Sequence, residues 1–192
     1  MKIESQETFQ KRLQEFGTWY ESGQVFAYPT EAVYGLGCDP LNKAAVYKIL
    51  SLKSREVEKG MILIASDFSQ IEPFVLFERL PQSAQQKILG SWPGPVTWLL
   101  PKSTKTPEWV SGDSNMLAVR ISSHPLVTQM CDYVGKPMVS TSANPAGRSP
   151  ALNAHELRGY FGNELRLLEG ALGSQNSPSK IFHSLTMETI RA

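Results

Sequence analysis

Cysteine is scarce in this sequence, whose 192 residues include only Cys38 and Cys131. The two lie far apart and outside any Cys-x-x-Cys arrangement, so neither a disulfide framework nor a zinc site is indicated. The sequence also lacks any stretch that approaches the ~20 consecutive apolar residues of a membrane span. Its first residues have no apolar core of the kind that signal peptides carry. We therefore expect a soluble protein of the reducing cytoplasm, with no membrane partner.

An excess of charge of one sign is absent as well. Lys and Arg together number 19 and Asp and Glu 18, so the net charge is +1. This near-neutrality argues against long, nonspecific nucleic-acid binding driven by counterion release, although it allows a local basic pocket. No repeat, low-complexity tract or linker divides the chain, and we interpret 174–179 as a mobile loop rather than a boundary. We expect a single domain over residues 1–192.

Several motifs of familiar enzymes are missing. There is no G-x-x-x-x-G-K-[ST] and no G-x-G-x-x-G, so a nucleotide would not be held by a Walker loop or a Rossmann turn. The G-x-S-x-G elbow is missing too. His124, His155 and His183 lie apart without ligand spacing, and His124 before Pro125 fits a helix start better than a base or ligand. No paired acidic motif suggests a metal site built by the protein, and we expect none.

Apolar periodicity and capping residues predict alternating helices and strands. The first helix is expected to run from a Ser5 cap to a Gly23 stop, and the second from an Asn42 cap to about Lys53. Further helices are predicted over 83–90, 125–134 and 153–162. Strands are predicted over 25–27, 61–65, 96–100, 117–121 and 137–144, with extended chain at 165–168 and a hairpin at 180–191. This alternation indicates an α/β fold with a mixed sheet flanked by helices.

The stretch 28–39, YPTEAVYGLGCD, follows the first predicted strand and breaks its alternation with a proline and two glycines. Loops at strand ends are where α/β proteins usually bind ligands. Gly35 and Gly37 would allow positive φ or a close approach of the backbone to a ligand. Thr30 and Glu31 would then face that ligand. The alternative is a glycine-containing turn that binds nothing.

Three other features of the sequence could take part in ligand binding or catalysis. Lys53, Arg55 and Lys59 concentrate cations after a predicted helix, which is also typical of a solvated helix end. The stretch 140–144, STSAN, offers three hydroxyls and an amide that can bind phosphate or carboxylate oxygens, or can form a simple polar turn. Arg120 ends an otherwise apolar strand. A partly buried arginine there needs an anionic partner, and a carboxylate held by two hydrogen bonds would suit it.

These stretches together resemble the YrdC-like family. The segments 28–37, 53–55, 92–97, 117–120 and 140–144 occur in the family's order and spacing, and the resemblance runs from about residue 25 to 191. It implies a twisted mixed α/β sheet with a concave, positively charged pocket. It also implies a nucleotidyltransferase reaction, in which L-threonine, bicarbonate or CO2, and ATP give threonylcarbamoyl-adenylate and pyrophosphate. The product would serve threonylcarbamoyladenosine modification of tRNA beside the anticodon.

The resemblance also implies roles for individual residues. Those expected to bind ATP are Lys53, Arg55, Ser142, Asn144, Ser179 and Arg191. Of these, the four expected to act at the reacting centre are Lys53, Arg55, Ser142 and Asn144. Those expected around threonine are Thr30, Arg120 and Ser140, with Arg120 clamping the carboxylate. Magnesium would arrive with ATP and keep mostly water and phosphate ligands.

Four positions depart from the family's pattern. Glu56 stands where a proline commonly follows Lys-x-Arg, and Ala65 lies near the place of a histidine that contacts threonine in many members. Met116 stands where other members have a polar residue that contacts ATP. Pro145 stands where they usually have Leu or Ile.

The resemblance also implies partners and leaves two rival functions. The expected partners are tRNA threonylcarbamoyl transferase proteins, which would consume the product, with weak direct RNA binding possible. One rival function is a nonenzymatic tRNA- or duplex-RNA-binding or ribosome-maturation protein, which near-neutral charge and the lack of an aromatic RNA-binding motif disfavour. The other is a carbamoyl-adenylate enzyme, whose accompanying acylphosphatase and zinc-finger segments are not found here.

Overall fold

The computed structural model describes residues 6–163, 165–175 and 177–192. Within these ranges, nine strands form one mixed sheet in the order β7-β1-β2-β6-β3-β5-β4-β8-β9. The strands are β1 (Phe26–Pro29), β2 (Tyr34–Gly37), β3 (Ile62–Ala65), β4 (Val96–Pro101), β5 (Met116–Ile121), β6 (Met138–Ser142), β7 (Arg166–Leu167), β8 (Lys180–His183) and β9 (Thr189–Arg191). The predicted mixed α/β fold is confirmed.

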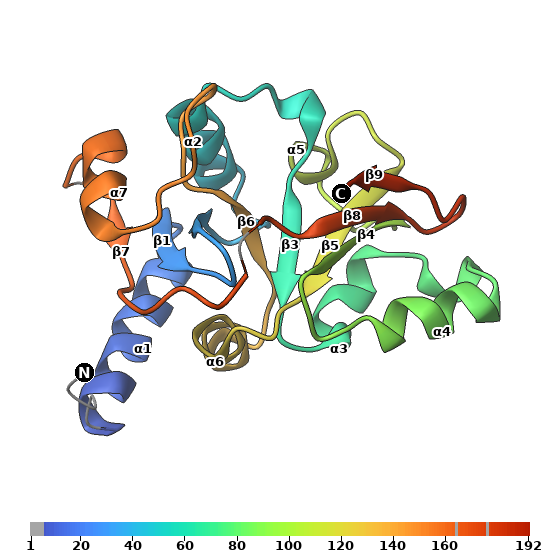
Figure 1. Ribbon diagram of the computed structural model, residues 1–192, viewed down its shortest axis with the longest axis horizontal. Coiled ribbons are helices and arrows are strands. Elements are labelled where there is room, and N and C mark those ends of the chain that lie inside the picture. Colours follow the sequence, from blue (N-terminus) through green and yellow to red (C-terminus); the bar gives the residue numbers. More distant parts are fainter. Residues whose placement is uncertain (1–5, 164, 176) are drawn as a thin grey trace.

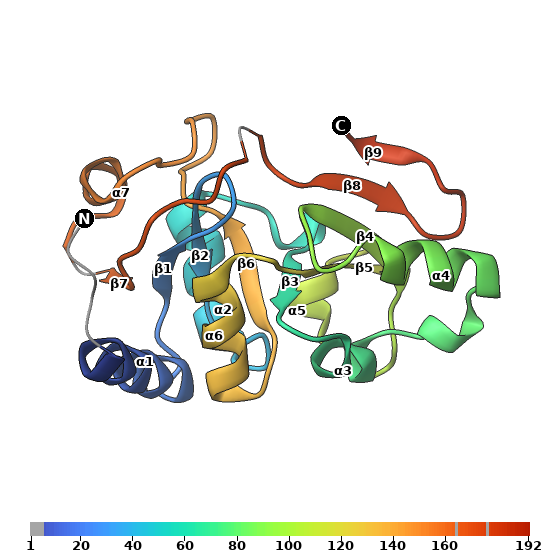
Figure 2. The same cartoon turned by 60° about the horizontal axis from the view of Figure 1, so that its bottom comes forward.

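Helices cover the sheet (Figures 1 and 2). They are α1 (Gln6–Glu21), α2 (Lys43–Lys53), α3 (Phe68–Ile71), α4 (Gln82–Gly90), α5 (Glu108–Ser111), α6 (Pro125–Val134) and α7 (Ala154–Phe161). Short 3-10 turns are η1 (Val57–Lys59), η2 (Glu72–Phe74) and η3 (Phe77–Arg79). In Figure 2, α1 and α6 lie in front of the strands near β1 and β6, while α2 lies behind them. None of the helices in the described ranges is both long and apolar enough to cross a bilayer.

Alternate residues along the central strands enter two separate cores. Phe26 of β1 and Ile64 of β3 pack with the apolar faces of α1 and α6. Their chain neighbours Ala27 and Leu63 belong to the larger core that includes α2. Successive side chains of a strand point to opposite faces, so a strand buried on both faces needs apolar residues at every position. This explains why residues 61–65 are uniformly apolar. The prediction that they form a central strand is confirmed by β3.

The sheet joins its two halves at β6, and this pairing brings polar strand residues together. β6 is antiparallel to β2, with Ser142 opposite Gly35, and antiparallel to β3, with Ser140 opposite Ile62. β3 also runs parallel to β5, where Ile64 lies opposite Arg120. Hydroxyls from β6 and a guanidinium from β5 are thereby placed on adjacent parts of one sheet.

Local signals at the element ends are largely confirmed. The Asn42 side chain accepts a hydrogen bond from the Ala45 amide at 3.0 Å and caps α2. α6 begins at Pro125, directly after His124, and residues 180–191 form an antiparallel hairpin of β8 and β9. The predicted Ser5 cap lies outside the described residues.

The prediction of a loop over 28–39 is wrong for residues 34–37, which form β2. Tyr28↔Gly35 and Phe26↔Gly37 are paired positions of an antiparallel hairpin. Neither glycine has a positive φ, which contradicts the first of the two uses expected for them. Gly37 instead provides space, because a Cβ there would lie 2.8 Å from a Phe26 ring carbon and 2.9 Å from the Val139 carbonyl oxygen. Glycines that read as loop residues therefore make room for buried aromatic rings.

We expect Gly37→Ala to lower the free energy of unfolding by about 1–3 kcal/mol, because the new methyl group overpacks a closed site. Urea denaturation followed by circular dichroism measures this loss. Gly90→Ala is the matched control, since nothing lies within 4 Å of a Cβ at the end of α4. Equal urea midpoints for Gly37→Ala and the parent protein would show that the hairpin accommodates the extra methyl group without strain.

Candidate active site

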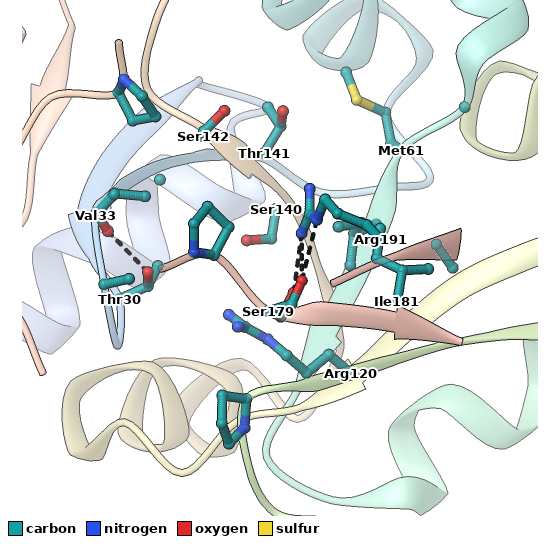
Figure 3. A pocket seen from close by; sticks show the side chains of 18 of the residues that line it. Thr30, Val33, Met61, Arg120, Ser140, Thr141, Ser142, Ser179, Ile181 and Arg191 are labelled. Carbon is teal, nitrogen blue, oxygen red and sulfur yellow. Dashed lines mark hydrogen bonds between the residues drawn. The ribbon is translucent and has the colours of Figure 1, made fainter. Parts of the chain in front are cut away.

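A cavity of about 440 Å³ opens where the sheet's polar strand residues meet the C-terminal hairpin (Figure 3). Its walls come from the turn between β1 and β2, the segment between α2 and β3, strands β5 and β6, the segment 177–179, and β9. Residues far apart in the sequence are therefore neighbours around one hollow.

Seven of the nine residues expected at the site line this cavity. They are Thr30, Arg55, Arg120, Ser140, Ser142, Ser179 and Arg191. Lys53 and Asn144 are not among the lining residues, and both are hydrogen-bonded to Ser142, which is. The fold thus gathers the predicted residues, while the role of each stays a prediction.

The cavity is much more positive than the protein as a whole. Its lining contains Arg55, Lys59, Arg120 and Arg191, and its only acidic residue is Glu31. Four cations against one carboxylate leave a local charge of +3, whereas the whole chain carries +1. A concave surface of one sign attracts ligands of the opposite sign and raises their local concentration. The arrangement suits an anionic ligand.

Arg120 already has an anionic partner inside the protein. Its Nη2 lies 3.1 Å from Glu31 Oε2, and both side chains are less than a tenth exposed. The Ser122 hydroxyl donates to Glu31 Oε1 at 2.7 Å. Burial by itself raises the pKa of Glu31, but the charge of Arg120 and the bond from Ser122 bring it below its ordinary value. The carboxylate therefore stays ionised and fixes the guanidinium at the cavity wall.

The sequence singled out Glu31 only as a residue that would face a ligand. Its pairing with Arg120 and Ser122 joins the β1–β2 turn to β5 and the segment after it. No sequence spacing indicates this contact, because about ninety residues separate the partners. The only available signal was the need of a buried Arg120 for an anion.

Arg191 ties the end of the hairpin to the segment that precedes it (Figure 3). Its Nη2 and Nε donate to the Ser179 carbonyl oxygen at 2.7 and 3.1 Å. The Ser179 hydroxyl in turn lies 2.8 Å from the hydroxyl of Thr97 on β4. Burial lowers the pKa of Arg191, and the nearby charge of Arg120 adds to this effect. Two guanidinium groups, from β5 and from β9, thus lie near each other in the cavity lining.

Lys53 holds the turn that follows β6. Its ammonium donates to the Ser142 carbonyl oxygen, to the Asn144 carbonyl oxygen at 2.8 Å and to Asn144 Oδ1 at 3.2 Å. The Ser142 hydroxyl also donates to Asn144 Oδ1, at 2.6 Å. Burial, with the charge of Arg55 as a further cause, lowers the pKa of Lys53 to about 8. The group is charged at neutral pH but lies close to its titration range.

The four positions that depart from the pattern of the YrdC-like family differ in whether they line the cavity. Met116 lines it, while Ala65 is fully buried and is not part of the lining. Glu56 forms an exposed ion pair with Lys59 at 2.9 Å. The Pro145 carbonyl oxygen accepts a hydrogen bond from Asn144 Nδ2 at 3.1 Å. Among them, only Met116 therefore changes the surface that a ligand would touch.

No group of three or more His, Cys, Asp or Glu side chains in the described ranges is arranged to hold a metal ion. The lining offers mainly cations and hydroxyls, which bind anions. It offers only a single carboxylate, the kind of group that binds a metal ion.

These features define an α/β protein with a cationic, hydroxyl-lined cavity at the polar ends of a mixed sheet. The model of the Sua5, YciO and YrdC family, which is described as telomere recombination, matches residues 19–192. The chain therefore belongs to this family, and the resemblance noted from its sequence is confirmed.

Curated relatives are similar over most of the chain. A threonylcarbamoyl-AMP synthase of Pseudoalteromonas atlantica is 53% identical over 172 residues, covering 90% of this chain and 92% of the relative. The protein of that name from Pseudomonas entomophila is 48% identical over 181 residues, covering 94% and 96%.

Solved structures share the fold. Sua5 of P. abyssi, crystallised with L-threonine, matches with a TM-score of 0.80 and 28% identity over 91% of this chain. The match covers 51% of the Sua5 chain, so the protein described here spans about half of that relative. E. coli YciO matches with a TM-score of 0.80 over 95% of this chain and 91% of its own, at 19% identity, and shows the fold alone.

We expect Glu31→Gln to lower the free energy of unfolding at pH 7 by about 3 kcal/mol, because it leaves the Arg120 charge buried without an anion. The pKa of Glu31 is lowered in the folded state, so its ion pair stabilises the protein above the ordinary carboxyl pKa of about 4.3. This stabilisation is lost as pH falls through the lowered value. The difference between variant and parent should therefore shrink in acid.

Urea denaturation at several pH values measures this difference. Glu56→Gln is the matched control, because it removes a carboxylate from the exposed pair with Lys59 and should leave stability unchanged. If Glu31→Gln is as stable as the parent at pH 7, the Arg120 charge does not need the Glu31 carboxylate as its partner.

Proposed function

We propose that this protein is an enzyme that makes L-threonylcarbamoyl-adenylate from L-threonine, bicarbonate or CO2, and ATP, with release of pyrophosphate. The observation that carries the proposal is the cavity itself, a +3 hollow lined with hydroxyls, in a chain 53% identical to a curated threonylcarbamoyl-AMP synthase over 90% of its length. The matched relatives of this name are covered almost completely, which supports transfer of the whole reaction.

The residue types suit this chemistry. The threonine amine and CO2 give a carbamate, whose anionic oxygen attacks the α-phosphorus of ATP. The bond from that phosphorus to the bridging oxygen breaks, and pyrophosphate leaves with the electron pair. Nucleophile and electrophile are both negative, so the reaction depends on positioning and on neutralisation of charge. Cations and neutral donors are needed more than a strong base.

The threonine end is assigned to the wall formed by β5, β6 and the β1–β2 turn. Arg120, held by Glu31, would bind the amino-acid carboxylate, and Thr30 and Ser140 would lie around the rest of the molecule. The Thr30 hydroxyl donates to the Val33 carbonyl oxygen at 2.8 Å, which leaves it as an acceptor for an ammonium or N–H group. P. abyssi Sua5 was crystallised with L-threonine, which supports threonine as the amino acid bound.

The nucleotide end is assigned to the rest of the lining, from Arg55 past the end of β6 to the C-terminal hairpin. Arg55 would bind the phosphates and Ser142 the reacting phosphoryl group, while Asn144, expected there from the resemblance but outside the lining, would act through the Ser142 hydroxyl. Ser179 and Arg191 would contact further parts of the nucleotide. Arg55 Nη2 donates to the Gly60 carbonyl oxygen at 2.9 Å, a contact that orients the guanidinium without cancelling its charge. Mg²⁺ would enter with ATP as part of the substrate.

The partners follow from the product. A threonylcarbamoyl-adenylate is a labile mixed anhydride, so tRNA threonylcarbamoyl transferase proteins would consume it in the cytoplasm. Direct RNA binding would be weak, since the whole chain carries a charge of only +1.

Incubation of the purified protein with MgATP, labelled bicarbonate and L-threonine should give a labelled adenylate and one pyrophosphate per product. Chromatography of the nucleotide products measures the adenylate, and a coupled assay measures pyrophosphate. Omission of threonine, or its replacement by another amino acid, is the control. If the protein forms no pyrophosphate with threonine but binds tRNA tightly at physiological salt, the enzymatic proposal fails and the RNA-binding alternative replaces it.

Arg120→Lys should weaken threonine binding about tenfold or more, because lysine keeps the charge but loses the planar fork that holds a carboxylate at two points. The KM for threonine in adenylate synthesis measures this change, while the KM for ATP should stay near that of the parent. Arg79→Lys, an exposed change in η3, is the control. An unchanged KM for threonine in Arg120→Lys contradicts the carboxylate clamp.

A further inference from the structure

The resemblance pairs Lys53 with Arg55 as triphosphate ligands, but the structure separates the two side chains. Arg55 lines the cavity, whereas Lys53 is 5% exposed and is absent from the lining. Lys53 ends α2, and Ser54 follows it in the left-handed conformation as the helix cap. The reversal of the chain at Ser54 places two neighbouring cations in different surroundings.

The ammonium group of Lys53 has no donor to spare. An ammonium carries three N–H donors. Lys53 has three acceptors, which are the carbonyl oxygens of Ser142 and Asn144 and the side-chain oxygen of Asn144. Among the residues that the structure describes, no carboxylate forms an ion pair with it. A phosphate could bind Lys53 only by displacing these oxygens.

The same turn is fixed from several other directions. The Ala146 amide donates to the Lys53 carbonyl oxygen at 2.9 Å, so the end of α2 holds the turn through its backbone as well. Asn144 Nδ2 donates to the Arg148 carbonyl oxygen at 2.8 Å. Asn144 Oδ1 accepts from both Lys53 and the Ser142 hydroxyl. The orientation of the Ser142 hydroxyl, which does line the cavity, thus depends on an amide that Lys53 orients.

We infer that Lys53 is a positioning residue, which acts on the substrate through Ser142 and Asn144 and makes no contact with the phosphates itself. Its charge compensates carbonyl oxygens that converge at the end of β6, and the turn so formed fixes the Ser142 side chain at the cavity, where a phosphoryl oxygen would take over the hydrogen bond that its hydroxyl now donates to Asn144 Oδ1. The inference rests on the proposed function for the identity of that group. It differs from the family resemblance, which assigns phosphate binding to Lys53 and Arg55 together.

The test separates nucleotide binding from turnover. Lys53→Met keeps the length of the side chain and removes its donors, so the turn that positions Ser142 loosens and kcat should fall ~100-fold, the loss expected from a displacement of about 1 Å at the reacting centre. The Kd for ATP, measured by calorimetry without threonine, should change less than about threefold, because no phosphate contact is lost. Arg55→Met is the matched comparison, and its Kd for ATP should rise about tenfold or more.

A double variant tests the route of the effect. If Lys53 acts through Ser142, then Lys53→Met combined with Ser142→Ala should have nearly the kcat of the weaker single variant, because both changes disable one unit. Multiplied losses, or a Kd for ATP in Lys53→Met that rises as much as in Arg55→Met, overturn the inference.

Two further measurements keep the inference testable. If Lys53→Met does not fold, Lys53→Arg gives the same comparison, since a guanidinium keeps the charge but cannot place three donors on these oxygens. Hydrogen exchange tests the turn without any assay of activity. Faster exchange of the Ala146 amide in the Lys53 variant than in Arg55→Met supports the inference even if the proposed reaction proves wrong, and equal exchange contradicts it.

Discussion

The pairing of β6 with β2 on one side and β3 on the other is the interaction on which the site depends. Without it, the hairpin of β1 and β2 would be separated from the strands that carry Arg120 and the C-terminal hairpin. The register places Ser142 opposite Gly35 and Ser140 opposite Ile62. Because side chains alternate along a strand, a shift of one residue would turn these hydroxyls to the other face.

The protein holds two of its four cavity cations with neutral oxygens. The Gly60 carbonyl orients Arg55, and the Ser179 carbonyl orients Arg191. Carbonyl dipoles fix a cation without cancelling its charge, so the positive field stays available to a ligand while the groups stay in place. Carboxylates pair with the other two cations, Glu31 with Arg120 inside the protein and Glu56 with Lys59 at the surface. The part of the lining around Arg120 and Glu31 is therefore less positive than the part around Arg55 and Arg191.

The sequence predicted the order of helices and strands well, because apolar periodicity and caps such as Asn42 are local signals. It also predicted which side chains would gather at the cavity, through the resemblance of separated motifs to one family. It could not predict β2, since the glycines that make room for Phe26 and Tyr28 look like loop residues. Nor could it show that Lys53 faces a turn while Arg55 faces the cavity. Both facts depend on contacts between distant parts of the chain.

The concentration of positive charge in the cavity has a consequence for the rest of the surface. A lining of +3 in a chain of +1 leaves a net charge of −2 on all other residues. The molecule therefore has a strong electric asymmetry, and its field turns an approaching polyanion toward the cavity mouth before contact. Dissolved ions weaken that field over about 8 Å at physiological ionic strength, so association with a nucleotide should slow as salt is added.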